Sequence, residues 1–317
     1  MMTAFSFSEP LSRAWTRMAD ALFRPFDIKK WFVVGFTAWL AGLASGGGGG
    51  SSAGQSGDRK AEGLGKLWET IVGNSLWLTL VAVGCFVLVA IVVAALWVSS
   101  RGKFMFLDNV VFNRALVVDP WKRFRMQGNS LFFFRVLFFL ACIILIGSMA
   151  LAIGGTVGFS FFDEVDTTAS IAIVFIAVCC FVSLIIGILY GVFFLDGFVV
   201  PLMHRYELGV LDGWRRFFEL LKQNALAFLL CGLFAIVLGV GVIILVVTFG
   251  CMTCCLGFLL LLIPYINSVF LLPISMFYRG FTLEFLAQFD PDLLPATAPA
   301  ALPPTEPPPP PPIEATL

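Results

Sequence analysis

IVGNSLWLTLVAVGCFVLVAIVVAALWV, residues 71–98, contains no charged side chain. An α-helix needs about 20 consecutive apolar residues to cross the hydrocarbon core of a bilayer, and it satisfies its own backbone hydrogen bonds there. The rest of the chain is similarly apolar: 59% of its 317 residues are hydrophobic and 13% are charged, whereas a soluble domain has about 25% charged residues. The composition therefore predicts an all-α integral membrane protein.

Five further apolar stretches have a similar character. They cover residues 27–45, 131–153, 170–195, 225–249 and 256–278. With 71–98 they predict a six-transmembrane-helix bundle, since the alternation typical of transmembrane β-strands is absent. The stretch at 27–45 is the weakest of the six, because Lys29 and Lys30 lie near its start and have to extend toward the membrane surface.

Lysine and arginine are distributed unevenly between the connections. The segments 1–30, 99–130, 201–224 and 279–317 hold 16 of the 20 basic residues. Because cytoplasmic loops of membrane proteins carry an excess of Lys and Arg, this asymmetry predicts that both termini lie in the cytoplasm. The glycine-rich run at 46–57 and the acidic stretch at 161–168 then fall on the outside.

Two similar phrases indicate an internal repeat. VDPWKRF occupies 118–124 and LDGWRRF occupies 211–217, and each follows a copy of FLD, at 106–108 and 194–196. An apolar run follows each phrase. We interpret the repeating unit as a cytoplasmic amphipathic segment followed by a two-helix hairpin, with FDIKKWF at 26–32 as a degenerate first copy.

The repeat predicts the domain organisation. We expect a cytoplasmic amphipathic helix at 1–26, a six-helix membrane domain at 27–289 and a disordered proline-rich tail at 290–317. The membrane domain divides into helical-hairpin repeats at 27–98, 131–195 and 225–278. Parallel repeats of this kind pack around an axis along the membrane normal, which predicts a pseudo-threefold arrangement.

The N-terminal helix has one apolar face. Its apolar residues recur at helical spacing, and they are Leu11, Trp15, Met18 and Leu22. Such a helix lies along the cytoplasmic surface of the membrane or at a subunit interface.

The two repeated phrases carry candidate interfacial anchors. These are Trp121, Lys122 and Arg123 in the first phrase and Trp214, Arg215 and Arg216 in the second. Tryptophan favours the membrane–water interface, and adjacent basic side chains reach anionic headgroups. The phrases are therefore expected to anchor each hairpin at headgroup level, with specific lipid recognition as the alternative.

Arg135 and Asp196 form a candidate intramembrane polar pair. Arg135 lies about one turn into its span and Asp196 lies at the end of another, with Asp108 in the equivalent place of the preceding repeat. Ionisable groups near the hydrocarbon are costly and mark pairing or function. A structural pair, extension of the side chains toward water, and a substrate or ion site are all compatible with this pattern.

Other residue types give weaker signals. Cys251, Cys254 and Cys255 could form a disulfide or pack as small residues at a helix turn. Pro264 and Pro273 flank Asn267, which predicts a kinked helix with one polar group directed toward the interior.

We predict no catalytic, cofactor-binding or metal site. His204 is the single histidine, so a histidine-rich metal site is excluded, and no pair of carboxylates suggests general acid–base chemistry.

RPFDIKKWFVVGFTAWLAGL (24–43), the glycine run after it and WVSSRGKFMFLDNVVFNRA (97–115) resemble an uncharacterised bacterial family of polytopic membrane proteins. More distantly, the layout is similar to the membrane domain that precedes some glycerophosphodiester phosphodiesterase domains. The phosphodiesterase domain itself does not occur in this sequence, so its activity is not implied. The resemblance implies a multi-pass protein of the bacterial cytoplasmic (inner) membrane.

These observations predict a non-enzymatic integral membrane protein with a scaffold, envelope-organising or lipid-interacting role. The alternative is a small transporter or channel with a path near Arg135, Asp196 and Asn267. The expected partners are membrane lipids and an unidentified membrane or cytoplasmic protein. A net charge of zero gives no reason to expect nucleic acid. The sequence leaves the oligomeric state open.

Overall fold

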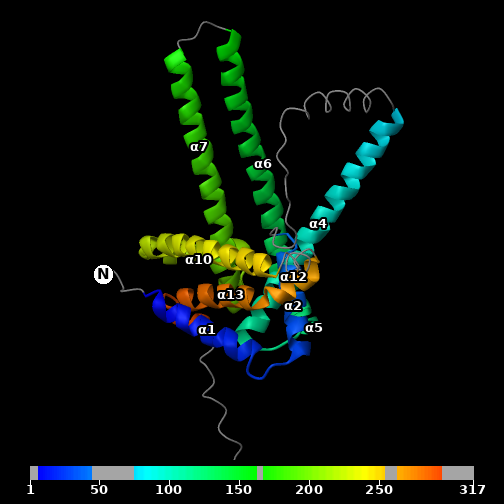
Figure 1. Cartoon of the computed structure of the whole chain (residues 1–317), viewed down its shortest axis with the longest axis vertical. Helices are drawn as coiled ribbons and strands as arrows, with labels where there is room; N and C mark the ends of the chain where they lie inside the picture. Colours follow the sequence, from blue (N-terminus) through cyan, green and yellow to red (C-terminus); the bar gives the residue numbers. More distant parts are fainter. Residues whose placement is uncertain (1–5, 45–74, 163–166, 254–262, 295–317) are drawn as a thin grey trace, which may run out of the picture.

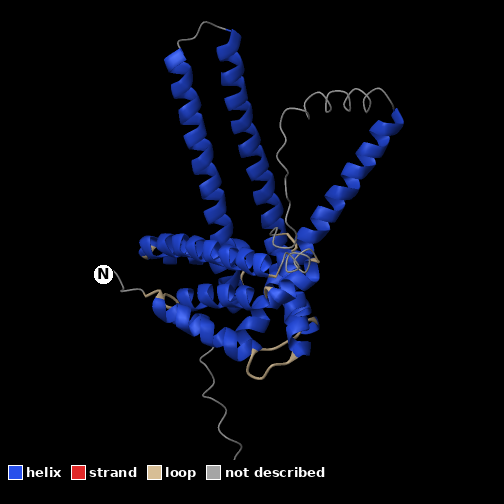
Figure 2. Cartoon of the chain, in the orientation of Figure 1, coloured by secondary structure: helices blue, strands red, loops and turns tan. Residues whose placement is uncertain are grey.

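The computed structural model describes residues 6–44, 75–162, 167–253 and 263–294. Helices make up the regular structure of these residues, and no strand occurs among them (Figure 2). In chain order they are α1 (Ser8–Leu22), α2 (Ile28–Gly42), α4 (Ser75–Phe112), α5 (Val118–Arg123), α6 (Arg125–Phe162), α7 (Thr167–Phe194), the π-helical turn η1 (Leu195–Val199), α8 (Val200–Tyr206), α9 (Val210–Gln223), α10 (Ala225–Met252), α12 (Pro264–Phe270), α13 (Leu272–Ala287) and the 3-10 turn η2 (Pro291–Leu293).

Four segments are long and apolar enough to cross a membrane. They are Ser75–Phe112, Arg125–Leu151, Phe175–Tyr206 and Ala225–Met252. In Figure 1, α6 and α7 run side by side as a long hairpin, α4 leaves the same base at an angle, and α10 lies across the foot of the hairpin. The prediction of an all-α, multi-pass membrane protein agrees with this arrangement.

The long helices expose their apolar side chains. In the most apolar 18-residue window of α4 no residue is buried, and in that of α10 only 17% are. Water would penalise such a surface heavily, because each square ångström of apolar area costs about 25 cal/mol when exposed. Lipid is therefore the solvent that fits these helices.

The opposite ends of the helices bury one another in a compact base. In α4 every residue from Ser99 to Val110 is buried, whereas the helix before Ala95 is exposed. Aromatic rings fill the centre of this base: Phe198 stacks on Phe217 at 5.6 Å between ring centroids, and Phe228 meets both rings edge-on. The core that holds the helices together thus lies at one end of the long spans.

The two predicted spans at 27–45 and 256–278 look different from the other four. α2 has 15 residues, which corresponds to about 22 Å and is shorter than the hydrocarbon core. The second stretch is divided at Leu271 between α12 and α13, and its residues 256–262 lie outside the described part. Six spans and a threefold repeat therefore remain predictions.

The N-terminal helix packs within the chain. α1 lies against α13, where a Cβ on Gly280 would be 3.4 Å from the Cβ of Ala14. Of the residues on its predicted apolar face, Met18 and Leu22 are buried, whereas Trp15 is 62% exposed. Ala14 and Ala21 take the central positions instead, because small side chains allow the two helices to approach closely.

Several predicted features lie outside the described residues. They are the glycine run at 46–57, the centre of the acidic stretch at 161–168, Cys254 and Cys255, and residues 295–317 of the predicted tail. The beginning of that tail is ordered: Pro291–Leu293 form the turn η2 and Leu293 is buried in the base.

Candidate functional site

Asp196 lies in the π-helical turn that joins α7 to α8. Pro201 explains this turn, since proline has no backbone N–H and crowds the carbonyl of the preceding turn. The N–H of Val200 accordingly bonds to the carbonyl of Leu195, five residues earlier. In the same pattern the carbonyl of Asp196 would pair with residue 201, which is the proline. The sequence therefore removes the helical partner of the Asp196 carbonyl.

Three basic side chains from three helices converge on Asp196. Lys103 of α4 donates to the Oδ2 atom. Arg135 of α6 donates to the Oδ1 atom at 2.8 Å. Arg279 of α13 donates to the backbone carbonyl that Pro201 leaves without a helical partner. We call these four residues, Lys103, Arg135, Asp196 and Arg279, the Asp196 cluster.

The Asp196 cluster holds more positive than negative charge. One carboxylate faces three cations, which leaves two positive charges in excess. Burial lowers the pKa of the Arg279 guanidinium to about 10, and the nearby Asp196 carboxylate opposes this effect. Arg279 therefore stays charged at neutral pH. The Nη1 atom of Arg135 is buried with no hydrogen-bond partner among the described residues, so the cluster also retains an unused donor.

A pocket of about 410 Å³ opens beside this cluster. Lys103, Asp196 and Arg279 form its polar wall, and Phe106, Phe193 and Tyr278 are among its aromatic residues. The volume is within the range of small-molecule sites, which is about 300–1,000 Å³. A mainly apolar pocket with a few convergent charges is the usual form of a site that orients a charged ligand.

The pocket lies where the exposed part of the spans meets the buried base. Residues 75–94 of α4 are exposed, and burial begins at Ser99, about one turn before Lys103. After α7 the change occurs at Leu195, the first residue of η1 and the neighbour of Asp196. The exposed length of α4 corresponds to about 30 Å, which equals the thickness of the hydrocarbon core. The Asp196 cluster is thus at the level where a lipid headgroup region would begin.

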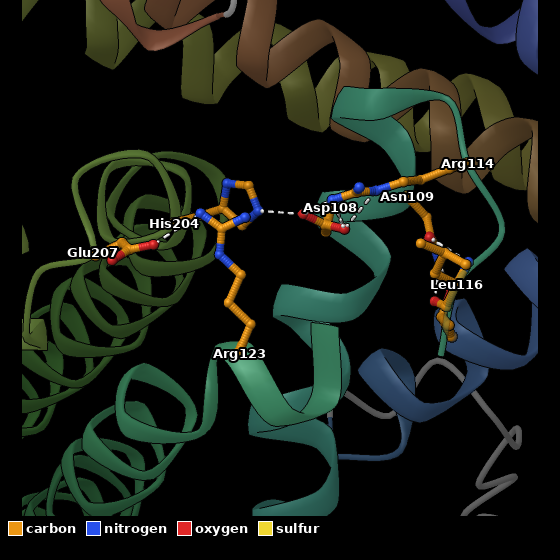
Figure 3. Close-up of polar contacts among 8 residues, drawn as sticks. Asp108, Asn109, Arg114, Leu116, Arg123, His204 and Glu207 are labelled. Carbon is orange, nitrogen blue, oxygen red and sulfur yellow. Dashed lines mark hydrogen bonds and ion pairs between the residues drawn. The ribbon is translucent and has the colours of Figure 1, made fainter. Parts of the chain in front are cut away.

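A second polar group surrounds Asp108, as Figure 3 shows. Asp108 is fully buried and accepts two hydrogen bonds from the Nη2 atom of Arg114, at 2.8 and 3.0 Å. The Nε2 atom of His204 lies 3.2 Å from its Oδ1 atom. Next to it, Asn109 bonds to both backbone groups of Leu116 and so fixes the turn after α4. The negative charge of Asp108 is therefore balanced by close partners, whereas the Asp196 cluster has an excess of positive charge.

The first set of predicted anchors lies on α5. Lys122 and Arg123 are exposed, and Arg123 pairs with Glu207 at 2.9 Å. Trp121 meets Trp97 edge-on, and the guanidinium of Arg101 lies 4.4 Å from the Trp97 ring centroid and 5.0 Å from that of Trp121. Trp121 therefore packs onto the end of the exposed part of α4.

The second set lies on α9. Trp214 packs against Phe217 and Phe218, and Arg215 is exposed. Arg216 pairs with Asp290 at 3.2 Å and covers the ring of Tyr206. Arg216 thus ties the start of the predicted tail to the base.

The structure brings Arg135 and Asp196 together but places Asn267 elsewhere. Asn267 lies in α12 and does not line the pocket. Its Oδ1 atom is buried with no hydrogen-bond partner among the described residues. Cys251 is a free thiol at the end of α10. No group of three potential metal-binding side chains occurs in the described part of the chain.

Sequence reasoning missed Lys103 and Arg279 as members of the site. The position of Lys103 could have indicated its role, because this charged residue lies shortly after the apolar run at 71–98 and directly before further apolar residues. The carbonyl of Asp196 lacks a helical partner only because the structure has a π-helical turn, in which residue 201 is the fifth residue after it. No pattern in the sequence indicated that Arg279 would bond to that carbonyl.

A family model described as a family of unknown function (DUF7544) matches residues 6–272. No curated protein and no solved structure matched the chain.

Proposed function

Because the chain belongs to this family of unknown function, we propose its function from the geometry: it binds the anionic headgroup of a membrane lipid at the Asp196 cluster. The observation that carries this proposal is the excess of two positive charges on the wall of an open pocket. An anion in that pocket would balance the charge. The protein is then a lipid-interacting scaffold of the membrane and not an enzyme.

The chemistry of the cluster fits a phosphate or carboxylate group. Lysine acts as a point charge for phosphate, and arginine forms charge-assisted hydrogen bonds with either group. A site that is partly shielded from water strengthens these interactions, because the effective dielectric constant is lower than in bulk. Lipid headgroups are the anions present at highest density at this level of a membrane.

We extend the proposal to topology: six membrane-crossing segments in a bacterial cytoplasmic membrane, with both termini in the cytoplasm. α1 and α13 pack together in the base at which α4 ends. If α4, α6, α7 and α10 each cross, one further crossing before Ser75 and one after Met252 keep both termini on the same side. Trp121, Lys122, Arg123, Trp214 and Arg215 then anchor the base at headgroup level.

A small transporter or channel is the alternative function. The buried Oδ1 atom of Asn267, which has no hydrogen-bond partner among the described residues, favours it. In this alternative, Arg135, Asp196 and Asn267 line a path for a polar solute. Against it, Asn267 does not line the pocket beside Asp196, and Asp196 is held by direct bonds to its basic neighbours.

Native mass spectrometry of the full chain tests the headgroup site. The probes are phosphatidylglycerol, which is anionic, and phosphatidylcholine with the same acyl chains. We expect the protein to bind phosphatidylglycerol more tightly, and we expect Lys103→Gln or Arg279→Gln to weaken that binding by about fivefold each, since a basic group near anionic lipid contributes about 1 kcal/mol. Lys222→Gln is the matched control, because Lys222 is an exposed residue of α9.

The result that would overturn the headgroup site is equal affinity for the two lipids with no effect of Lys103→Gln or Arg279→Gln. Thermal unfolding of each variant in the same detergent separates loss of the site from loss of the fold. Transport of a labelled solute by reconstituted vesicles, with no lipid preference, would favour the alternative function.

A further inference from the structure

A second cavity adjoins the pocket of the Asp196 cluster. It measures about 370 Å³ and lies between α7, α10 and α13. Phe193 and Tyr278 line both spaces, so the two share a wall. The hydroxyl of Tyr278 donates a hydrogen bond to the backbone carbonyl of Ala235, which fixes the ring between α10 and α13. We call this second space the apolar cavity.

Among the described residues, no charged side chain lines the apolar cavity. Its residues include Ile186, Leu189, Ala235, Ile236 and two glycines of α10, Gly232 and Gly239. The two glycines leave room where helices approach. A Cβ on Gly232 would lie 2.4 Å from the ring of Tyr190, and a Cβ on Gly239 would lie 3.5 Å from the hydroxyl of Tyr278. The first position cannot accept a side chain without rearrangement, whereas the second can.

We propose that the apolar cavity holds an acyl chain of the lipid whose anionic headgroup binds Lys103 and Arg279. This inference rests on the proposed function and names the ligand as an amphiphile with its charge and its chain in neighbouring spaces. Burying each methylene of the chain is favourable, because the hydroxyls of the two lining tyrosines, Tyr190 and Tyr278, already donate to backbone carbonyls of α10. A hydrophilic ligand would leave this space without a suitable occupant.

Charge complementarity selects a lipid over a soluble anion. A free phosphate could bind the Asp196 cluster, but it would gain nothing from a cavity lined by aliphatic and aromatic side chains. A neutral lipid could fill the apolar cavity, but it would leave the two excess positive charges of the cluster unbalanced. A lipid with an anionic headgroup fits both spaces: its headgroup balances the charge of the cluster and its chain fills the apolar cavity. The apolar windows of α7 and α10 are also largely exposed, which suits contact with lipid.

Filling the apolar cavity tests the inference. Gly239→Leu places a side chain at a lining position, and Gly241→Leu is the matched control two residues later on α10, where nothing lies within 4 Å of an added Cβ. Native mass spectrometry of the full chain is carried out with dioleoyl phosphatidylglycerol, dioleoyl phosphatidylcholine and glycerol 3-phosphate. We expect Gly239→Leu to weaken phosphatidylglycerol binding by about tenfold, and Gly241→Leu to leave it unchanged. Glycerol 3-phosphate, which has the headgroup charge and no chain, should bind more weakly than the lipid.

The outcomes distinguish the two proposals. If Lys103→Gln weakens phosphatidylglycerol binding but Gly239→Leu does not, the headgroup site stands and the acyl-chain inference is wrong. Equal binding of glycerol 3-phosphate and the lipid would also overturn the inference, because it would identify a soluble anion as the ligand. If no preference for an anionic probe exists, both proposals fail. Should Gly239→Leu unfold the protein, Ile236→Trp fills the same cavity from a neighbouring position.

Discussion

The Nη2 atom of Arg135 lies 2.8 Å from the Oδ1 atom of Asp196, although 61 residues separate them in the chain. The bond joins α6 to the turn at the end of α7. Lys103, which lies on α4, donates a hydrogen bond to the same carboxylate. One acidic side chain thus connects three of the four long helices. The apolar windows of these helices are little buried, so the contacts that hold the helices together lie in the base, and this carboxylate is one of them.

Asp196→Asn should destabilise the protein strongly. The substitution removes the one carboxylate that balances Lys103, Arg135 and Arg279 and leaves buried cations without a counter-charge. Removing one partner of a buried ion pair costs about 3 to 5 kcal/mol. Thermal unfolding in detergent should show a large fall in the midpoint. Arg123→Gln, which breaks an exposed pair with Glu207, is the control and should change it little.

Pro201→Ala should partly rescue Arg279→Gln. Arg279 supplies the hydrogen bond that Pro201 prevents the helix from making to the Asp196 carbonyl. Alanine restores a backbone N–H at position 201, so the carbonyl regains a helical partner. A double-mutant cycle on unfolding free energies should give a coupling of about 1 kcal/mol. Strictly additive effects would contradict this role of Arg279.

Gly102→Ala should separate α2 from α4. A Cβ at this position would lie 2.7 Å from the backbone N atom of Ala41 and the backbone C atom of Leu40, and backbone cannot move aside as a flexible side chain can. We expect a loss of about 1 to 3 kcal/mol in unfolding free energy. Gly84→Ala lies on the same helix with nothing within 4 Å and should be neutral or slightly stabilising.

Arg114→Gln should cost more than Asp108→Asn. Asp108 is fully buried, so removing Arg114 leaves its carboxylate with His204 as the remaining close partner, whereas the side chain of Arg114 is 39% exposed and water can hydrate it when residue 108 is neutral. We expect the glutamine variant to lose about 3 kcal/mol and the asparagine variant less. Chemical unfolding of both variants gives the comparison, and a larger loss in the asparagine variant would contradict this account.

Reporter fusions should show both termini in the cytoplasm. Green fluorescent protein fused before α1 or after Leu294 is expected to fluoresce, because it folds in the cytoplasm and not after export in an unfolded state. Alkaline phosphatase fused after Phe162, at the far end of α6, is expected to be active. A dark fusion at one terminus and a bright fusion at the other would mean an odd number of crossings.

Much of the fold follows from local sequence. The long apolar runs predicted α4, α6, α7 and α10, because a run without charges has to avoid water whatever its neighbours are. The amphipathic pattern predicted α1 with an apolar face that includes Trp15, but not which residues contact the rest of the chain. The contact face is decided by the partner helix α13, whose Gly280 requires a small residue opposite it. The sequence showed the helical period of α1, but it did not show which face of α1 contacts α13.

The candidate site was only partly predictable. Arg135 and Asp196 could each be identified as candidates from the sequence, since a charged residue in or beside an apolar span is unusual. Lys103 and Arg279 complete the cluster from positions 32 residues before Arg135 and 83 residues after Asp196, and no local pattern connects them. The apolar cavity depends on how α7, α10 and α13 cross, which involves glycines that look ordinary in the sequence.

The sequence by itself determined that the chain is helical and multi-pass, because hydrophobicity and backbone hydrogen bonding act on each segment independently. The tertiary structure alone decided which charges meet, which faces are buried and where cavities remain. These features depend on distances between helices far apart in the chain, and such distances are fixed only when the whole base packs.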